Sequence, residues 1–169
     1  MKALVSQFEA TVGKWIGFLD AYSLDELQRR PPDGSWSLGQ VYVHMINDTR
    51  FFVEQMRAAL FSEEHAADRM TPWAVTMFAA GSFPEGRIQG PATHTPIPQP
   101  ESIEELRAAL DGILQDVHGI DFSGGRGKTG HPGLGYFTAS EWLQFAEMHL
   151  RHHFRQKERI DVALFQKSF

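Results

Sequence analysis

The sequence predicts an all-α protein organised as a four-helix bundle. Four segments place apolar residues three and four positions apart, which is the spacing that gives a helix one apolar face. Three of these segments open on a capping box, in which a serine or threonine stands three positions before a Glu or Gln. Few stretches alternate apolar and polar residues as a strand would, so we expect helices packed against one another with no substantial sheet.

The four predicted helices follow one another along the chain. They cover about residues 2–22, 38–60, 103–118 and 139–165. The last three open on the capping boxes Ser37 with Gln40, Ser102 with Glu105, and Thr138 with Glu141. A further box, Ser23 with Glu26, predicts only a short turn of helix, because two prolines follow soon after it.

Two connections between the helices are unusual. The connection between the second and third helices, residues 61–101, is long and contains six prolines and three glycines. Long loops of this kind usually serve a function, and we expect a short helix within residues 70–83, packed by Trp73 and Phe78. The connection over residues 119–135 holds seven glycines and predicts a flexible surface turn.

Composition narrows the class of protein. With 169 residues, 42% of them hydrophobic and 22% charged, the chain fits one globular domain spanning 1–169. A net charge of −5 without a basic stripe argues against a nucleic-acid partner. The chain has no apolar run of about 18 residues to span a membrane, and its start lacks the apolar core of a signal peptide. We therefore expect a cytoplasmic protein, and because it has no cysteine, any soft metal ligand must be histidine.

The fourth predicted helix carries the strongest chemical signal. At about 100° per residue, His149 and His153 fall near the middle of its apolar stripe, and His152 falls at the edge. Two imidazoles four residues apart on one face are typical of helical two-histidine metal sites. The alternative is a pair of core histidines hydrogen-bonded to their neighbours. Charged residues occupy the opposite side of the helix: Glu147, Arg151, Arg155 and Glu158.

A third ligand has to come from another helix, and His44 is the only histidine within the second one. It flanks the apolar stripe, with Asp48 one turn further on, and a flanking position can still face a seam between helices. His44 is therefore either a metal ligand whose ring donates a hydrogen bond to Asp48, or a boundary histidine that only pairs with Asp48. We expect the histidines in or beside loops to be solvated: His65, His94, His118 and His131.

Three motifs, in chain order, resemble the DinB/YfiT-like family. Residues 34–44, GSWSLGQVYVH, are similar to the Trp-Ser/Thr opening of the family's second helix and its first ligand histidine. Residues 131–143, which contain HPGLG and TASEWL, are similar to the approach to its last helix. The pattern His149-x-x-x-His153-x-x-Gln156 is similar to its second and third ligands and a trailing glutamine. The Pro-rich connection has no counterpart in these motifs.

The resemblance implies a four-helix bundle, often a dimer, in which His44, His149 and His153 hold a divalent nickel or zinc ion. His152 could take the place of His153 only if the helix were rotated by about 100°. Three protein ligands with open positions are typical of a catalytic metal rather than a structural one. Better-understood relatives act with low-molecular-weight thiols such as bacillithiol or mycothiol, and others are described as metal-dependent hydrolases.

These features support three alternative functions. The first is a metal-dependent enzyme that activates a small thiol, a thiol S-transferase. The second is a hydrolase that uses metal-bound water, with Asp48 or Glu141 as the candidate base. The third is a non-catalytic metal-binding protein. We also expect a small-molecule substrate and a homodimer, the latter because large apolar side chains are abundant in the first and fourth helices.

Overall fold

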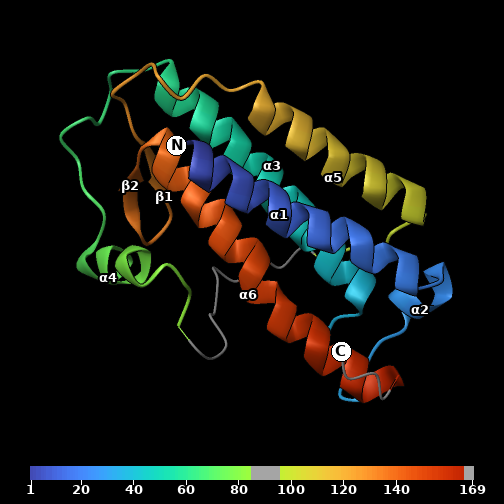
Figure 1. Ribbon diagram of the computed structural model, residues 1–169. Helices are drawn as coiled ribbons and strands as arrows, with labels where there is room; N and C mark the ends of the chain where they lie inside the picture. The colour runs from blue at the N-terminus through green and yellow to red at the C-terminus, as the bar shows by residue number, and fades with distance from the viewer. Residues whose placement is uncertain (85–95, 166–169) are drawn as a thin grey trace.

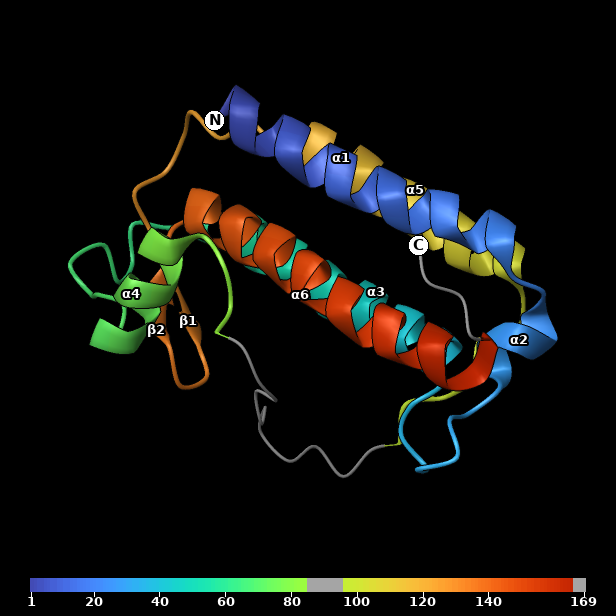
Figure 2. The same ribbon diagram turned by 60° about the horizontal axis from the view of Figure 1, so that its bottom comes forward.

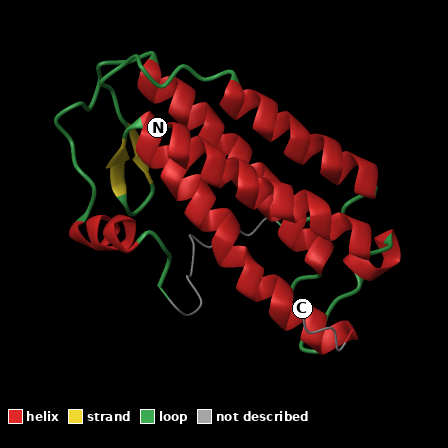
Figure 3. Cartoon of the chain, viewed as in Figure 1, coloured by secondary structure: helices red, strands yellow, loops and turns green. Residues whose placement is uncertain are grey.

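The computed structural model describes residues 1–84 and 96–165. Its secondary structure is 65% helix, and the helices pack together (Figures 1 and 3). The prediction of an all-α protein with more than half of its residues helical is confirmed, with a small β-hairpin in addition. None of the described helices is long and apolar enough to cross a membrane.

The bundle consists of the helices α1 (Lys2–Phe18), α3 (Leu38–Leu60), α5 (Ile103–His118) and α6 (Ala139–Phe165). The most extensive contact is between α3 and α6, while α1 packs against α6 and α5, and α5 packs against α3. Each helix therefore contacts two neighbours, as in a closed four-helix bundle. Figure 2 shows the two layers, α1 beside α5 and α3 beside α6. The bounds of α3, α5 and α6 agree with the sequence prediction.

The first helix ends earlier than the predicted range of 2–22. The α-helical part stops at Phe18 and continues as one 3₁₀ turn, η1 (Leu19–Ala21), a tightening that is common at helix ends. Tyr22 then has an extended backbone, and its hydroxyl donates to the Asp161 carboxylate of α6 at 2.7 Å. This buried contact draws the chain away from a further helical turn.

The helix starts confirm the capping boxes at Ser23, Ser37 and Thr138, whereas at Ser102 the bond from the amide three residues on is present without the reciprocal one. Ser37 accepts a hydrogen bond from the Gln40 amide, and the Gln40 side chain accepts one from the Ser37 amide. The short helix α2 (Leu24–Gln28) opens on the same reciprocal arrangement. At the start of α5 and of α6, the side chains of Ser102 and Thr138 each accept from the amide three residues on. Each bond satisfies an amide that a helix start leaves unpaired.

The core between the two layers is built from large aromatic side chains whose polar atoms are paired. The Trp15 indole N–H donates to the Leu150 carbonyl at 3.1 Å, and the Tyr42 hydroxyl donates to the Trp15 carbonyl at 2.7 Å. These two bonds connect α1 with α6 and with α3. Because buried indole and phenol groups need such partners, they set how the helices lie along one another.

The glycine-rich connection is mostly an exposed turn as predicted, but its second part forms a β-hairpin that the sequence did not predict. Strands β1 (Thr129–His131) and β2 (Gly135–Phe137) pair antiparallel, and Phe137 is fully buried. A Cβ added at Gly125 would collide with the carbonyl of Leu60. The glycines therefore allow the chain to approach α3 closely, which a larger residue would prevent.

The predicted short helix within residues 70–83 is present as α4 (Pro72–Ala80). Its inner side consists of Ala74 and Met77, and Phe78 packs edge-on against the Phe137 ring at 5.0 Å. Trp73 is 49% exposed, so the prediction that it packs this helix is wrong. Neighbouring residues are about 100° apart around a helix, so turning Ala74 inward directs Trp73 outward.

The Pro-rich connection returns to the bundle beside the start of α3. The Gln40 side-chain amide donates to the Ile97 carbonyl at 2.6 Å, and the Ser37 hydroxyl donates to Gln99 at 2.8 Å. Its central part, which includes His94, lies outside the described residues.

Candidate metal centre

His149 and His153 lie one turn apart on α6, with their Nε2 atoms 3.2 Å apart. The His149 side chain is 12% exposed and His153 is 7% exposed. The Gln156 side-chain oxygen accepts a hydrogen bond from His153 Nδ1 at 2.8 Å, so the Nε2 of His153 carries a lone pair. This placement agrees with the helical register predicted from the apolar stripe of α6.

His44 of α3 completes a cluster of three histidines. Its ring centroid lies 5.2 Å from that of His149 and 5.0 Å from that of His153. One nitrogen from each of the three rings lies within 4.8 Å of the other two. The Trp36 ring, from the motif that precedes α3, packs against His44 at 5.1 Å. The flanking position of His44 therefore faces the seam between α3 and α6.

Asp48 lies at the edge of the three-histidine cluster. Its Oδ1 is 3.6 Å from His44 Nδ1, and its Oδ2 is 3.6 Å from His149 Nε2. These distances exceed a hydrogen bond but keep the carboxylate beside both rings. The Asp48 side chain is 38% exposed, so the cluster opens toward solvent on this side. The pairing of His44 with Asp48, which the sequence left as an alternative, is present together with the cluster.

Two aromatic rings border the cluster and were not identified as site residues from the sequence. The Phe52 ring of α3 lies 5.5 Å from the His149 ring. The Phe83 ring lies 6.2 Å from His149 and 5.4 Å from His152. The inward stripe of α3 already includes Phe52, but no local pattern connects Phe83 with α6. Such apolar walls lower the local dielectric and strengthen electrostatic interactions within the site.

Burial keeps the three histidines neutral. It lowers the pKa of His149 well below its ordinary value, helped by the neighbouring His153 and His44. Burial, followed by the influence of His44, lowers the pKa of His153 to about 3. Burial also lowers the pKa of His44, partly opposed by the Asp48 charge, and it raises the pKa of Asp48. Imidazoles that stay neutral at pH 7 offer the lone pairs that a metal ion requires.

This donor set could hold a divalent metal ion. Neutral imidazoles are common ligands of such ions, and the chain has no cysteine that would compete. The 3.2 Å between the two Nε2 atoms is close to the roughly 3.3 Å between tetrahedral ligands that each lie about 2.0–2.1 Å from one ion. When both Nε2 atoms of His149 and His153 carry lone pairs, they repel each other, and an ion between them removes this repulsion.

Glu141, the second candidate base, has a different role. Its carboxylate accepts hydrogen bonds from the amide and the hydroxyl of Thr138 at 2.7 and 2.8 Å, which caps α6. It precedes His149 by about 12 Å along the helix axis. Of the two candidate carboxylates, the structure therefore places Asp48 beside the histidines and Glu141 at the helix start.

Glu147 departs from the sequence prediction, which grouped it with the exposed charges of α6. It is 1% exposed and accepts from the Thr11 hydroxyl of α1 at 3.0 Å and from the Arg151 guanidinium at 2.9 Å. The prediction is wrong because α6 packs against two neighbours, and this side of the helix faces α1 rather than solvent. Arg155 and Glu158 are exposed.

His131 is partly buried, so it is less solvated than the sequence predicted. It lies in β1, with its ring 5.6 Å from those of Phe137 and Trp142, and burial lowers its pKa. The hairpin, which the sequence did not predict, causes this partial burial. The expected solvation is confirmed at two histidines that pair with carboxylates at the surface, His65 with Asp68 and His118 with Glu9.

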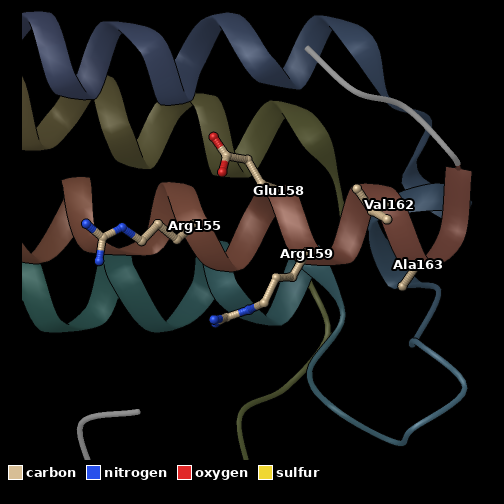
Figure 4. A pocket seen from close by; sticks show the side chains of 5 residues that line it. All are labelled: Arg155, Glu158, Arg159, Val162 and Ala163. Atoms are coloured by element: carbon tan, nitrogen blue, oxygen red, sulfur yellow. The ribbon is translucent and has the colours of Figure 1, made fainter. Parts of the chain in front are cut away.

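A shallow hollow of about 420 Å³ lies further along α6 (Figure 4). All five of its lining side chains come from this helix: Arg155, Glu158, Arg159, Val162 and Ala163. None of the three clustered histidines lines it, so the hollow is distinct from the candidate metal centre.

A helical bundle that brings three neutral histidines together from two facing helices defines a candidate metal-binding bundle protein. The chain belongs to the DinB superfamily, whose family model matches residues 7–156. The matched range contains the three histidines and ends at Gln156, which confirms the resemblance seen in the sequence motifs. Comparison with curated proteins gives no match, and comparison with solved structures gives none.

The metal-free protein is expected to lose stability as the pH falls from 7.5 to 5.5. The three histidines have lowered pKa values when folded, so the unfolded chain, with histidine pKa values near 6.5, binds more protons. The stability is fully present above about pH 6.5 and falls below it by up to about 1.4 kcal/mol per pH unit for each histidine. The raised pKa of Asp48 acts in the opposite sense, but it is a single group.

Urea unfolding of chelator-treated protein at the two pH values measures this effect. His149→Gln should flatten the pH dependence, because it removes one buried imidazole. Equal free energies of unfolding at both pH values in the native protein would contradict the predicted burial of neutral rings.

Proposed function

We propose that this protein is a metal-dependent enzyme that activates a small thiol, with His44, His149 and His153 as the ligands of a nickel or zinc ion. The main support is the convergence of three neutral imidazoles, with one nitrogen from each ring within 4.8 Å of the others. Three ligands leave coordination positions open, and the partly exposed Asp48 marks a side from which a substrate can approach. When bound, the ion would lower the pKa of a thiol and so supply the nucleophile at neutral pH.

The residues of the chain would hold and shield the reacting groups. Gln156 keeps the His153 ring in the tautomer that presents Nε2, which is the common role of a hydrogen-bond partner to a ligand. Phe52 and Phe83 exclude water on the side of His149. Asp48, with its raised pKa, lies where it can receive the proton that the thiol gives up.

A hydrolase is the second candidate, and the position of Asp48 favours it. A carboxylate 3.6 Å from two of the candidate ligands can take a proton from an attacking water. This function needs no thiol, and Asp48 would then be indispensable. A non-catalytic metal-binding role remains the third candidate and would be favoured if no substrate reached the ion.

Metal analysis of protein purified without added ions, followed by turnover assays, tests this proposal. We expect about one zinc or nickel ion per chain. We also expect the protein to consume an electrophilic substrate only when a biological thiol such as glutathione, bacillithiol or mycothiol is added. Asp48→Asn separates the two reactions. It should slow hydrolysis roughly 10²–10⁴-fold, as loss of a general base does. Thiol transfer should slow less, because the ion itself lowers the pKa of the thiol. Ester hydrolysis without thiol would favour the second candidate, and no turnover with a loaded ion would favour the third.

We also propose that the protein forms a homodimer that acts on a small-molecule substrate. This expectation was based on the apolar residues of α1 and α6, but many of them lie in the core of the bundle and cannot contact a partner. Val12, Trp15, Trp142 and Leu150 are all buried. Other large apolar side chains are exposed and offer better support for a partner surface: Phe61 at 91%, Val75 at 54% and Trp73 at 49%.

A further inference from the structure

Two buried polar atoms have no hydrogen-bond partner among the described residues, the Thr49 hydroxyl oxygen and the Nδ1 of His149. Thr49 is 0% exposed. Its helix, α3, and that of His149, α6, form the most extensive contact in the bundle. Because nearly all buried polar groups in proteins are paired, two unpaired atoms on facing helices require an explanation.

The residues around Thr49 contact the His149 ring. Asp48 precedes Thr49, and its Oδ2 lies 3.6 Å from His149 Nε2. Phe52 follows three residues later, on the same side of the helix as Thr49, and its ring lies 5.5 Å from that of His149. Thr49 therefore lies on the part of α3 that packs against His149.

The position of one proton on His149 decides whether the ring can bind an ion. His153 donates from Nδ1 to Gln156, so its Nε2 carries a lone pair. In the metal-free protein, His149 can carry its proton on Nε2 and donate it to the lone pair of His153 Nε2, 3.2 Å away. The Nδ1 of His149 then carries no proton. An ion needs a lone pair on the Nε2 of His149 as well. The proton of the neutral ring must then move to Nδ1, where it needs an acceptor.

We propose that Thr49 is a positioning residue whose hydroxyl oxygen accepts the Nδ1 proton of His149, directly or through one buried water, when the ion is bound. This inference rests on the proposed metal site. The ring gains and loses no proton, because the proton leaves Nε2 and binds Nδ1 of the same imidazole. Pairing the two orphaned atoms stabilises the tautomer that presents Nε2 to the ion, and such partners commonly fix the orientation of a ligating ring.

Thr49→Val tests this role, because valine keeps the shape of the side chain and removes the hydroxyl. The affinity for zinc alone, measured by competition with a chelator dye, should fall about 10–100-fold, the usual effect of losing such a partner. The unfolding midpoint of the metal-free variant should hold or rise, because the hydroxyl is unpaired in that state. Thr49→Ser should restore the affinity. In the zinc-loaded protein, the ring ¹⁵N shifts of His149 should report a proton on Nδ1 that is lost or weakened in Thr49→Val.

Thr11→Val is the matched control, a buried threonine whose hydroxyl donates to Glu147 on another part of α6. It should lower the stability and leave the zinc affinity intact, the reverse of Thr49→Val. If Thr49→Val bound zinc within about twofold of the native protein, far from the 10–100-fold expected, with an unchanged His149 signal, the role of Thr49 would be overturned and the metal site would stand. Native protein with no affinity for zinc or nickel would overturn the metal site and this inference together.

Discussion

His153→Ala is expected to remove most metal binding, with a larger loss than the roughly 10–100-fold that follows removal of a supporting residue. Its Nε2 lies 3.2 Å from that of His149 and forms one corner of the three-histidine cluster. Without it two imidazoles remain, too few for the arrangement of three protein ligands that catalytic sites keep. Titration with zinc or nickel, monitored by calorimetry, measures the loss, and circular dichroism checks that the helical content is unchanged.

His152→Ala is the matched control for this prediction. The residue is adjacent in sequence, but its ring packs against Phe83 at 5.4 Å and is not part of the cluster. We expect this variant to keep nearly the native affinity. If His152→Ala lost the metal and His153→Ala kept it, the assignment of ligands on α6 would be wrong.

Asp161→Asn is expected to destabilise the protein by roughly 3–5 kcal/mol, the usual effect of breaking a buried ion pair. Asp161 is 1% exposed, accepts from the Lys157 ammonium at 2.6 Å, and accepts from the Tyr22 hydroxyl at 2.7 Å. The ammonium also lies 4.3 Å from the centre of the Phe18 ring. The variant leaves this buried cation without the opposing carboxylate, so the free energy of unfolding in urea should fall.

Asp116→Asn provides the comparison at the surface. Asp116 pairs with Arg57 at 2.6 Å, but both side chains are more than 40% exposed, and such pairs contribute only about 0–1 kcal/mol. A loss below about 1 kcal/mol for Asp161→Asn, equal to that of the surface variant, would contradict the stabilising role of the buried pair.

Local sequence patterns determined the long helices and the placement of two of the three clustered histidines. At the starts of α3, α5 and α6, a serine or threonine side chain accepts a hydrogen bond from the amide three residues on, so the sequence alone predicts these bonds. The placement of His149 and His153 on one face of α6 likewise depends only on the helical repeat. Patterns of this range predicted the bounds of three of the four long helices.

Only the tertiary structure decided which residues from distant parts of the chain contact one another. Periodicity placed His44 at the edge of the apolar stripe of α3 and did not decide whether it is a metal ligand or a partner of Asp48. The packing of α3 on α6 placed it beside the two histidines of α6 as well as beside Asp48. The same packing buried Glu147 on a side of α6 that the helical pattern assigned to solvent, because α1 covers that side. Helical periodicity describes one helix at a time, whereas burial and ligand geometry depend on which neighbours surround it.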